Sequence, residues 1–470
     1  MKSARLITAV AVLAVLAGGG VAAATRPAPK PAARFVTDDQ GRVLLLHGFN
    51  TASSAKSTPD GLPTFTEADL DREYRDMGTN FVRFLIQWRT LEPTPGTYDT
   101  KYLDKVAERV AWYAKRGYHV MLDMHQDLWG SDITPGKGAG NGAPGWATHL
   151  DGLPVSTDQP TWEMYYLEPG VIRAFDHFWN TTGDHPELMD HYAKAWKAVA
   201  ARFKDDPAVI GYDLMNEPWG GSIQGAQFET GPLATLYRRS IAEIRSVDPD
   251  GWIFLEPQAV GVNWGLPSAL PHFDDPRDGQ PRIGLAPHLY PLPLDLGDDY
   301  TAGSRRWTDR TLGWWRDNIL RTAERVGGPV VLGEFGLDMS RPGSPDLVKR
   351  VLQLTDQVNM GHAYWSRDPG PWGPYDDKGK PGPLVAAMAR PYPRAVGGVP
   401  VSVAYDEKSR ALTLVFDANS TGPTEIYLPA RDFPHGGRAS IGEATWDAGR
   451  RVLTVKTKTA GRLTLTITPG

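Results

Sequence analysis

The stretch VIGYDLMNEP, residues 209–218, joins an apolar run to Asn216, Glu217 and Pro218. The apolar residues have the length and composition of a buried strand. A carboxylate at the end of such a strand is costly to bury, and it is kept only where the charge is paired or used. One carboxylate rarely makes an active site, so Glu217 predicts a partner elsewhere in the chain.

Similar apolar runs alternate with amphipathic stretches from residue 41 onward, which is the pattern of βα units around a parallel sheet. The amphipathic stretches include residues 66–78 and 101–117, which end at Gly78 and Gly117 as helices commonly do. Eight runs predict an α/β fold of the (β/α)8 TIM-barrel type. They are RVLLLHGF (42–49), NFVRFLI (80–86), HVMLDMH (119–125), VIGYDLMN (209–216), WIFLEP (252–257), RIGLAPHLY (282–290), PVVLGEFG (329–336) and GHAYWS (361–366).

The active site of a TIM barrel lies where its strands end, and polar residues gather at the predicted ends. Glu334 ends the seventh run as Glu217 follows the fourth, so both should point into one mouth from opposite sides. Two such carboxylates are the machinery of glycoside hydrolysis, and retention of configuration needs them about 5 Å apart. Capping and loop solvation explain one or two polar strand ends but not the whole set. The other members are Arg83, His125, Asp127, Asn216, Glu256, His288, Tyr290 and Trp365.

Two regions lie outside the repeating pattern. The connection from Asp127 to about residue 185 is too long for an ordinary βα loop, and its aromatic residues predict a wall over the site. After residue 395 short runs alternate apolar and polar residues, which predicts an antiparallel β-sandwich over 396–470. The sandwich is interpreted as a structural cap on the barrel at 36–395, with a carbohydrate- or lipid-binding module as the alternative. The aromatic residues of the long connection are Trp146, Trp162, Tyr165, Tyr166 and Trp179.

The N-terminus has the pattern of an exported protein. Lys2 and Arg5 precede an apolar stretch that ends in small residues, which predicts a secretory signal over 1–24 and a secreted, extracellular enzyme. A membrane anchor is the alternative, although the stretch is barely long enough to span. Residues 25–35 form a Pro/Ala linker. The absence of Cys excludes disulfides and thiolate metal sites, and the net charge of -5 argues against nucleic acid.

The motifs resemble those of glycoside hydrolase family 5, a clan A family of retaining (β/α)8 enzymes, over residues 41 to about 390. LMNEP (214–218) matches the family's acid/base motif, LGEFG (332–336) its nucleophile motif, and PHLY (287–290) its His-x-Tyr. Arg83 and Trp365 fall where the family has an Arg and the Trp under the sugar. DMHQDLWG (123–130), LMNEPWGG (214–221) and HGFNTASSAKSTPDG (47–61) look most like the bacterial secreted endoglycoceramidases.

The resemblance implies a role for each residue of the mouth. Glu334 is expected to be the nucleophile, kept ionised by Arg83 and Tyr290. Glu217 is expected to be the acid/base, protonated at the start because of an apolar setting and the nearby Glu334 charge. Substrate contacts are expected from Lys56, Arg83, His125, Asp127, Asn216, His288, Tyr290 and Trp365, joined by Trp162 or Trp179. His125 as a satisfied barrel histidine and Lys56 as a solvated loop residue remain alternatives.

The implied function is cleavage of the β-bond between the oligosaccharide and ceramide of glycosphingolipids. An endo-β-glucanase or β-glucosidase acting on soluble sugars is the alternative, and a non-catalytic sugar- or lipid-binding protein is a third. The apolar loops 262–273 and 290–296 would either form the lipid groove or pack on each other. At least one of Trp314 and Trp315 should face the barrel.

No metal or cofactor is expected. Asp184, His185 and His191 are interpreted as a helix start with Asp184 as its N-cap, rather than as a metal cluster. The substrate is the only expected partner of a monomer, with room for transient contact with a membrane or micelle surface.

Overall fold

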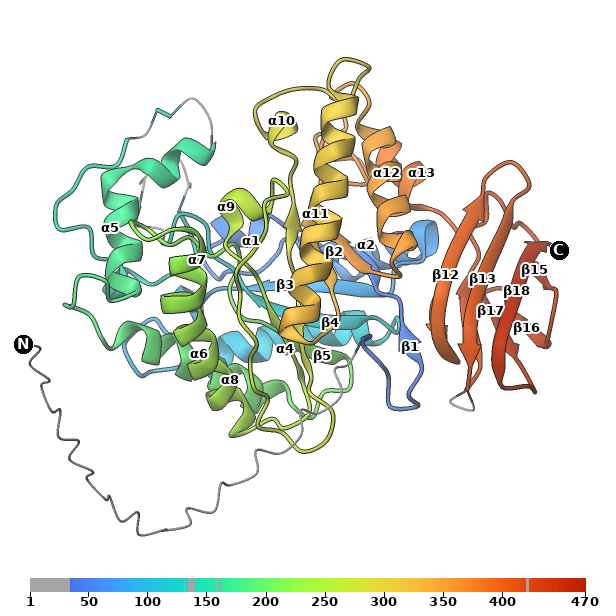
Figure 1. The fold of residues 1–470 in the computed structure, drawn as a ribbon, viewed down its shortest axis with the longest axis horizontal. Coiled ribbons are helices and arrows are strands. Elements are labelled where there is room, and N and C mark those ends of the chain that lie inside the picture. The colour runs from blue at the N-terminus through green and yellow to red at the C-terminus, as the bar shows by residue number, and fades with distance from the viewer. Residues whose placement is uncertain (1–33, 131, 134–139, 157, 160–161, 420–421) are drawn as a thin grey trace, which may run out of the picture.

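The computed structural model describes residues 34–130, 132–133, 140–156, 158–159, 162–419 and 422–470. The predicted signal at 1–24 lies outside the described residues, as does all of the linker except residues 34 and 35. Two parts are plain in Figure 1: a barrel wrapped by helices, and a pair of sheets at one end of the molecule. The helix α5 stands at the opposite end from those sheets.

A parallel sheet of nine strands forms the barrel, and the TIM-barrel prediction is confirmed. The strands are β2 (His47–Asn50), β3 (Phe81–Ile86), β4 (His119–Met124), β5 (Val209–Asp213), β6 (Trp252–Leu255), β7 (Ile283–Leu285), β8 (His288–Leu289), β9 (Val331–Phe335) and β10 (Gly361–Tyr364).

The predicted sixth run is split between two of these strands, and this split closes the barrel. β7 pairs with β6 through Ile283 and Ile253, whereas β8 pairs with β9 through His288 and Glu334. The two short strands therefore act as one barrel strand that joins both edges of the sheet. The pairing also places His288 directly beside Glu334.

Helices cover the outside of the barrel and present apolar stripes to it. Thr66 and Asp69 form a capping box at the start of α2, and Gly78 ends that helix with a φ of 62°, as predicted. Gly117 follows α4 with a φ of 70°. The helices are α1 (Ser54–Ser57), α2 (Glu67–Met77), α3 (Trp88–Leu91), α4 (Thr100–Ala114), α5 (Pro169–Phe178), α6 (Leu188–Phe203), α7 (Gly225–Phe228), α8 (Ala234–Arg245), α9 (Ala259–Val262), α10 (Leu292–Asp295), α11 (Arg305–Val326), α12 (Ser344–Gln357) and α13 (Pro383–Met388).

The predicted N-cap of α6 was wrong. The helix begins at Leu188, with Glu187 rather than Asp184 in the capping position. Thr182 and Asn180 instead hold the backbone before it, through hydrogen bonds to the amides of Asp184 and His185. Within the described chain, no helix is both long and apolar enough to cross a bilayer.

The two antiparallel sheets at the far end form the predicted β-sandwich, but they do not divide from the barrel at residue 396. One sheet takes in β1, which lies before the barrel, and β11, where the expected boundary falls. The other has the order β12-β13-β18-β15. Apolar residues from both sheets make one core. The strands are β1 (Val43–Leu44), β11 (Tyr392–Val396), β12 (Gly398–Asp406), β13 (Ala411–Ala418), β14 (Thr424–Tyr427), β15 (Gly437–Ala439), β16 (Glu443–Asp447), β17 (Val452–Lys456) and β18 (Gly461–Pro469).

The predicted first run, 42–49, is therefore shared between two sheets. β1 pairs with β11, antiparallel, in the sandwich, whereas β2 pairs with β3 and β10 in the barrel. A chain that changes sheets within a few residues ties the two parts together at their base.

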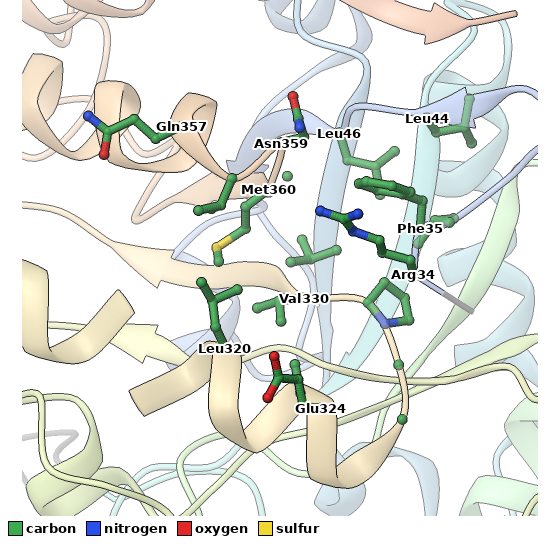
Figure 2. Close-up of a pocket in the computed structure, with 18 of the residues that line it drawn as sticks. Arg34, Phe35, Leu44, Leu46, Leu320, Glu324, Val330, Gln357, Asn359 and Met360 are labelled. Atoms are coloured by element: carbon green, nitrogen blue, oxygen red, sulfur yellow. The ribbon is translucent and has the colours of Figure 1, made fainter. Parts of the chain in front are cut away.

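A cavity of about 580 Å³ opens at this base, where β2, β9 and β10 begin. Figure 2 shows its lining, in which Leu44, Leu46 and Met360 are apolar and Glu324 is the one carboxylate among the lining residues. The cavity lies at the N-terminal ends of the strands, away from the face that carries active sites in TIM barrels.

Candidate active site

Arg83 organises the mouth of the barrel from the end of β3. Its side chain is completely buried, and burial alone would lower its pKa, but four carboxylates raise that pKa well above the usual range. The guanidinium charge is therefore fixed, and it holds like charges together that would otherwise repel. Arg83 lies 2.9 Å from Asp123, 2.7 Å from Asp213, 2.8 Å from Glu256 and 2.8 Å from Glu334.

Glu217 and Glu334 are brought together as the sequence predicted. Arg83 donates to Oε1 of Glu334 at 2.8 Å, and the Tyr290 hydroxyl donates to Oε2 at 3.0 Å. Oxygen atoms of Glu217 and Glu334 and a nitrogen of His288 all lie within 4.8 Å of one another. This spacing fits the short separation of retaining glycosidases, because inverting enzymes keep their carboxyl groups about 6.5–9.5 Å apart.

His288 sits between these carboxylates and is completely buried. Its Nδ1 lies 2.9 Å from Oε1 of Glu217, and its Nε2 lies 3.1 Å from Glu256. The carboxylates outweigh burial and raise the His288 pKa well above its ordinary value, so the ring is the positively charged imidazolium, with a proton on each nitrogen. Glu217, His288 and Glu334 are the one group in the described chain with the spacing of a metal site. A protonated ring whose two nitrogens face carboxylates is a donor rather than a metal ligand.

The pKa directions of the two glutamates are the reverse of those expected. Burial raises the Glu334 pKa, and the charges of His288 and Arg83 only partly offset it. Burial would also raise the Glu217 pKa, but the hydrogen bond and charge of His288 outweigh burial and lower it. The prediction did not take into account the charge of His288, which donates a hydrogen bond from Nδ1 to Glu217. Glu217 and His288 therefore share one acidic proton, which lies on His288 while Glu217 is ionised.

The backbone also directs Glu217 toward this site. Its φ is 42°, in the left-handed region that costs a non-glycine residue about 1–3 kcal/mol. Oε2 of Glu256 accepts a hydrogen bond from the Glu217 amide at 3.0 Å, and the Asn263 side chain donates to Oε1 of Glu217 at 2.8 Å. These contacts hold the strained residue in place.

A polar group forms one wall of the mouth. Lys56 from α1 lies 2.8 Å from Asp127 and 4.1 Å from the ring centre of Trp365. His125 stacks on Trp365 with an angle of 10° between the rings, and its Nδ1 contacts Asp123 at 2.8 Å. The structure thus brings Lys56, His125, Asp127 and Trp365 to one side of the carboxylate pair. Asn216 lies beside them, with Oδ1 accepting from Arg83 at 2.9 Å.

The other wall of the mouth is largely apolar. A cleft of about 380 Å³ contains Glu217 and Glu334, and the segments after β6 and β8 line one side of it. Its polar residues are Asn263 and Tyr290, which bind the two glutamates, and Asp295, which accepts a 3.0 Å hydrogen bond from the Trp264 indole. Burial raises the Asp295 pKa well above its ordinary value. The apolar lining from these segments is Ala259, Val260, Pro291 and Leu294.

The long connection contributes only part of its aromatic residues to the cleft. Trp162 and Tyr166 line the cleft. Of the two tryptophans predicted as alternatives, Trp162 or Trp179, it is therefore Trp162 that reaches it. Trp179 is buried beneath the site instead, where its indole donates to the carbonyl of Trp219 at 2.8 Å. Trp146 donates to the carbonyl of Glu92 and packs on Trp88, and Tyr165 is buried.

The two loops predicted to form the lipid groove also contribute only some of their apolar residues to the cleft. Leu294 lines the cleft but is 3 % exposed, whereas Leu292 on the same short helix is outside the lining. Leu266 and Leu296 are exposed, so these loops do not simply pack on each other. Trp315 faces the barrel, where its indole donates to the His288 carbonyl at 2.7 Å, and Trp314 is exposed.

Comparison with known proteins identifies the family. The model described as "Cellulase (glycosyl hydrolase family 5)" matches residues 38–370, and the "Glycoside hydrolase family 5 C-terminal domain" matches residues 390–468. The chain belongs to glycoside hydrolase family 5. It is therefore a glycosidase, and the mouth described above is its candidate active site.

Relatives within family 5 match the chain over most of its length. "Endoglycoceramidase I" of Rhodococcus hoagii (strain 103S) is 30 % identical over 455 residues, which cover 92 % of this chain and 86 % of that protein. The structure of "Endo-glycoceramidase II from Rhodococcus sp." in a ganglioside GM3 complex is 55 % identical, with a TM-score of 0.91 over 93 % of this chain and all of that one. Its lactosyl-enzyme intermediate is 54 % identical, with a TM-score of 0.88 over the same shares.

Four functional residues of this family 5 site were missed or given no role by the sequence reasoning. Asp123 and Asp213 are carboxylates inside apolar strands, a pattern that could have been noticed because buried charges need partners. Glu256 was recognised as a strand end but received no role. Asn263 follows α9 in an irregular loop, and its sequence carries no comparable signal.

Proposed function

We propose that this chain is a retaining glycosidase that releases the intact oligosaccharide of a glycosphingolipid from its ceramide. The single observation that carries the proposal is a carboxylate pair set between one polar and one apolar wall of the same cleft. The polar wall suits a sugar and the apolar wall suits a lipid. The named relatives act on, or are crystallised with, molecules that join these two parts.

In the first step an oxygen of Glu334 attacks the anomeric carbon, and the bond from that carbon to the glycosidic oxygen breaks. Arg83 and Tyr290 each bind one oxygen of Glu334, so the carboxylate is oriented before the attack. Glu217 gives a proton to the departing oxygen. A covalent glycosyl-enzyme and free ceramide result.

The proton that Glu217 gives comes from the pair it forms with His288. Transfer from Nδ1 of His288 to Glu217, across 2.9 Å, leaves a neutral ring and a protonated acid. His288 and Asn263 both bind Oε1 of Glu217, so the proton arrives on Oε1, and a rotation of the carboxyl group presents it to the glycosidic oxygen. The lowered Glu217 pKa and the role of Glu217 as an acid are compatible on this account.

In the second step Glu217, now ionised, takes a proton from water, and the water oxygen attacks the anomeric carbon. The bond to Glu334 breaks, the sugar leaves with its original configuration, and the pair regains its proton. Lys56, His125 and Asp127 would bind hydroxyl groups of the sugar, and Trp365 would stack under its ring. Asn216 would bind the 2-hydroxyl.

The proposal is tested by offering the enzyme lactosylceramide in detergent and cellotetraose in buffer, with the products identified by mass spectrometry. We expect intact lactose and ceramide from the first and little product from the second. Efficient cleavage of cellotetraose with no ceramide released would replace the proposal by an endo-β-glucanase.

We also propose that the enzyme is exported, with residues 1–24 removed, and that it works as a monomer. The charged and then apolar N-terminus supports export. Mass spectrometry of protein from the culture medium should find a chain that starts near residue 25. Retention of the full chain in the cell membrane would support the anchor instead, and sedimentation at the mass of two chains would overturn the monomer.

A further inference from the structure

The exposed large apolar side chains of the described residues are not spread evenly over the molecule. Eight of the ten lie in segments that follow barrel strands β4, β6, β8 or β10, and two lie on the sandwich strand β12. A soluble protein normally scatters such residues singly, and a gathered set marks an interaction surface. The eight are Trp162, Met164, Leu167, Leu266, Leu296, Trp307, Trp314 and Trp372.

The outward face of α11 is the centre of one such surface. Trp307 and Trp314 are 57 % and 52 % exposed, and they lie two helical turns apart on one face with ring centres 6.3 Å from each other. The buried face of the helix carries Trp315 and Ile319 in place of them. An amphipathic helix normally keeps its outward face polar, so two adjacent indoles there are unusual.

Two leucines continue this surface toward the cleft. Leu296 is 64 % exposed directly after α10, the helix whose Leu294 lines the cleft. Leu266 is 59 % exposed in the loop after α9, and Asn318 of α11 fixes that loop by donating to the Gly265 carbonyl at 2.7 Å. In Figure 1 α10 lies beside the upper end of α11. The exposed patch and the apolar wall of the cleft therefore share the same two loops.

The patch also carries positive charge. α11 contains six arginines and three acidic residues, a local balance of +3 in a chain whose net charge is -5. Arg306 and Arg310 are exposed beside Trp307, and the Arg310 guanidinium lies 5.7 Å from the centre of the Trp307 ring. The nearest opposing charge in sequence is Asp309, and its carboxylate accepts from Tyr300 at 2.8 Å and lies 3.3 Å from Arg350. Indoles beside arginines suit the boundary of a membrane, where Trp lies at the headgroup level and Arg binds phosphate.

We infer that this patch, defined as Leu266, Leu296, Arg306, Arg310, Trp307 and Trp314, docks the enzyme on a phospholipid bilayer that contains anionic headgroups. The inference rests on the proposed function, because a substrate anchored in a bilayer must be reached from its surface. Docking at α11 brings to the bilayer the two loops that also line the apolar wall of the cleft. A ceramide can then enter beside Leu294 without leaving the lipid completely.

The first experiment measures binding without catalysis. Wild-type enzyme is sedimented with vesicles of phosphatidylcholine and phosphatidylglycerol that contain no glycolipid. We expect Trp307→Ala combined with Trp314→Ala to weaken binding at least about tenfold, because each indole loses apolar contact with the membrane. Arg306→Glu with Arg310→Glu should also weaken it, and pure phosphatidylcholine should bind wild-type enzyme less well.

Two matched controls use exposed residues at the sandwich. Val399→Ser with Val401→Ser removes apolar surface from β12, and Arg438→Glu reverses a charge on β15. Both should leave vesicle binding unchanged. Equal binding by wild-type enzyme and the tryptophan variant would overturn the inference. A change in sedimentation mass on substitution, with no vesicle binding by wild-type enzyme, would instead make the patch an interface between copies.

The second experiment separates docking from chemistry. Hydrolysis of lactosylceramide in vesicles is compared with hydrolysis of a soluble aryl lactoside. We expect the tryptophan variant to lose at least about tenfold on vesicles and to keep full activity on the aryl lactoside, which needs no membrane. Equal losses on both substrates would overturn the inference. Failure of the wild-type enzyme on every form of lactosylceramide would instead refute the proposed function, and vesicle binding would still decide on the patch.

Discussion

The two walls of the active-site cleft differ in how they are built. On the polar wall each charged group has a partner, from the partly exposed Lys56 with Asp127 to the buried Arg83 with its four carboxylates. On the apolar wall Val260, Pro291 and Leu294 offer only apolar surface, and the same two loops carry the exposed Leu266 and Leu296. A network fixes positions to fractions of an ångström, whereas an apolar surface only requires contact.

This difference predicts how strictly each wall selects its part of the substrate. The polar wall can reject a wrong sugar because an unpaired buried donor or acceptor costs about 1–3 kcal/mol. The apolar wall can favour lipids as a class but cannot measure their chain length sharply, because each methylene contributes only about 0.8 kcal/mol. Changes on the two walls should therefore have effects of different size and different substrate dependence.

The largest effect is expected at the carboxylate pair. Glu334→Gln and Glu217→Gln should each lower kcat/KM on lactosylceramide by about 10⁴-fold, because one removes the nucleophile and the other the general acid. Glu229→Gln is the matched control, since this buried glutamate accepts three hydrogen bonds outside the cleft. Normal activity of the control with an unchanged Tm would assign the loss to chemistry. Activity near wild type in either cleft variant would refute the assigned roles.

The next effect is expected in stability. Arg83→Met should lower the free energy of unfolding by about 3–5 kcal/mol, because buried carboxylates are left without their counter-charge. Arg245→Met is the comparison, since that arginine, whose side chain is 4 % exposed, forms its ion pair with Asp275 alone among the described carboxylates. Urea unfolding of both variants measures the difference. A smaller loss for Arg83 than for Arg245 would show that the polar wall does not depend on this hub.

A smaller effect, confined to lipid substrates, is expected from the apolar wall. Val260→Asp places a charge in that wall and should lower kcat/KM on lactosylceramide about tenfold, while an aryl lactoside should be cleaved almost normally. Val260 is a better site than Leu294, because Leu294 is so deeply buried that a charge there would disturb the fold. Leu292→Asp, outside the cleft lining, is the control. Equal loss by both variants would mean that the wall does not contact the lipid.

The smallest effect is expected in the pH profile. Burial raises the Glu334 pKa above 4.5, and the protonated form cannot attack. Activity on an aryl lactoside should therefore fall as pH decreases through the raised pKa, with the acid limb of kcat/KM above pH 4.5. A limb at or below pH 4.5 would show that Arg83 and His288 dominate over burial. The profile of the free enzyme is measured by varying the aryl lactoside below its KM.

The sequence was sufficient for the parts that depend on local pattern. Each of the eight apolar runs ended in, or directly before, a Gly, Pro or polar residue, so the barrel and the positions of Glu217 and Glu334 followed from chain order. The pKa directions could not follow, because they depend on the 2.9 Å contact between His288 and Glu217. That distance results from the pairing of β8 with β9, which closes the barrel and is not encoded by any one segment.

The lipid side was less predictable for a related reason. The loops 262–273 and 290–296 were correctly recognised as apolar, but the pattern could not tell Leu294, which faces the cleft, from Leu296, which faces outward. Irregular loops have no fixed period that assigns side chains to faces. On α11 the period exists, and the prediction that at least one of Trp314 and Trp315 faces the barrel is confirmed by Trp315.

The strand β1 has a consequence for the order in which the protein can be completed. Leu44 pairs with Ala395, which is 351 residues later in the chain. At about 5–20 residues per second, a ribosome needs roughly 20 to 70 s to make the intervening chain. One of the first described strands to be synthesised therefore waits for β11, and the sandwich core is complete only after β12 to β18 have followed. Truncation past residue 44 should thus expose the edge of β11, whereas truncation at the C-terminus should remove β18 from the middle of the other sheet.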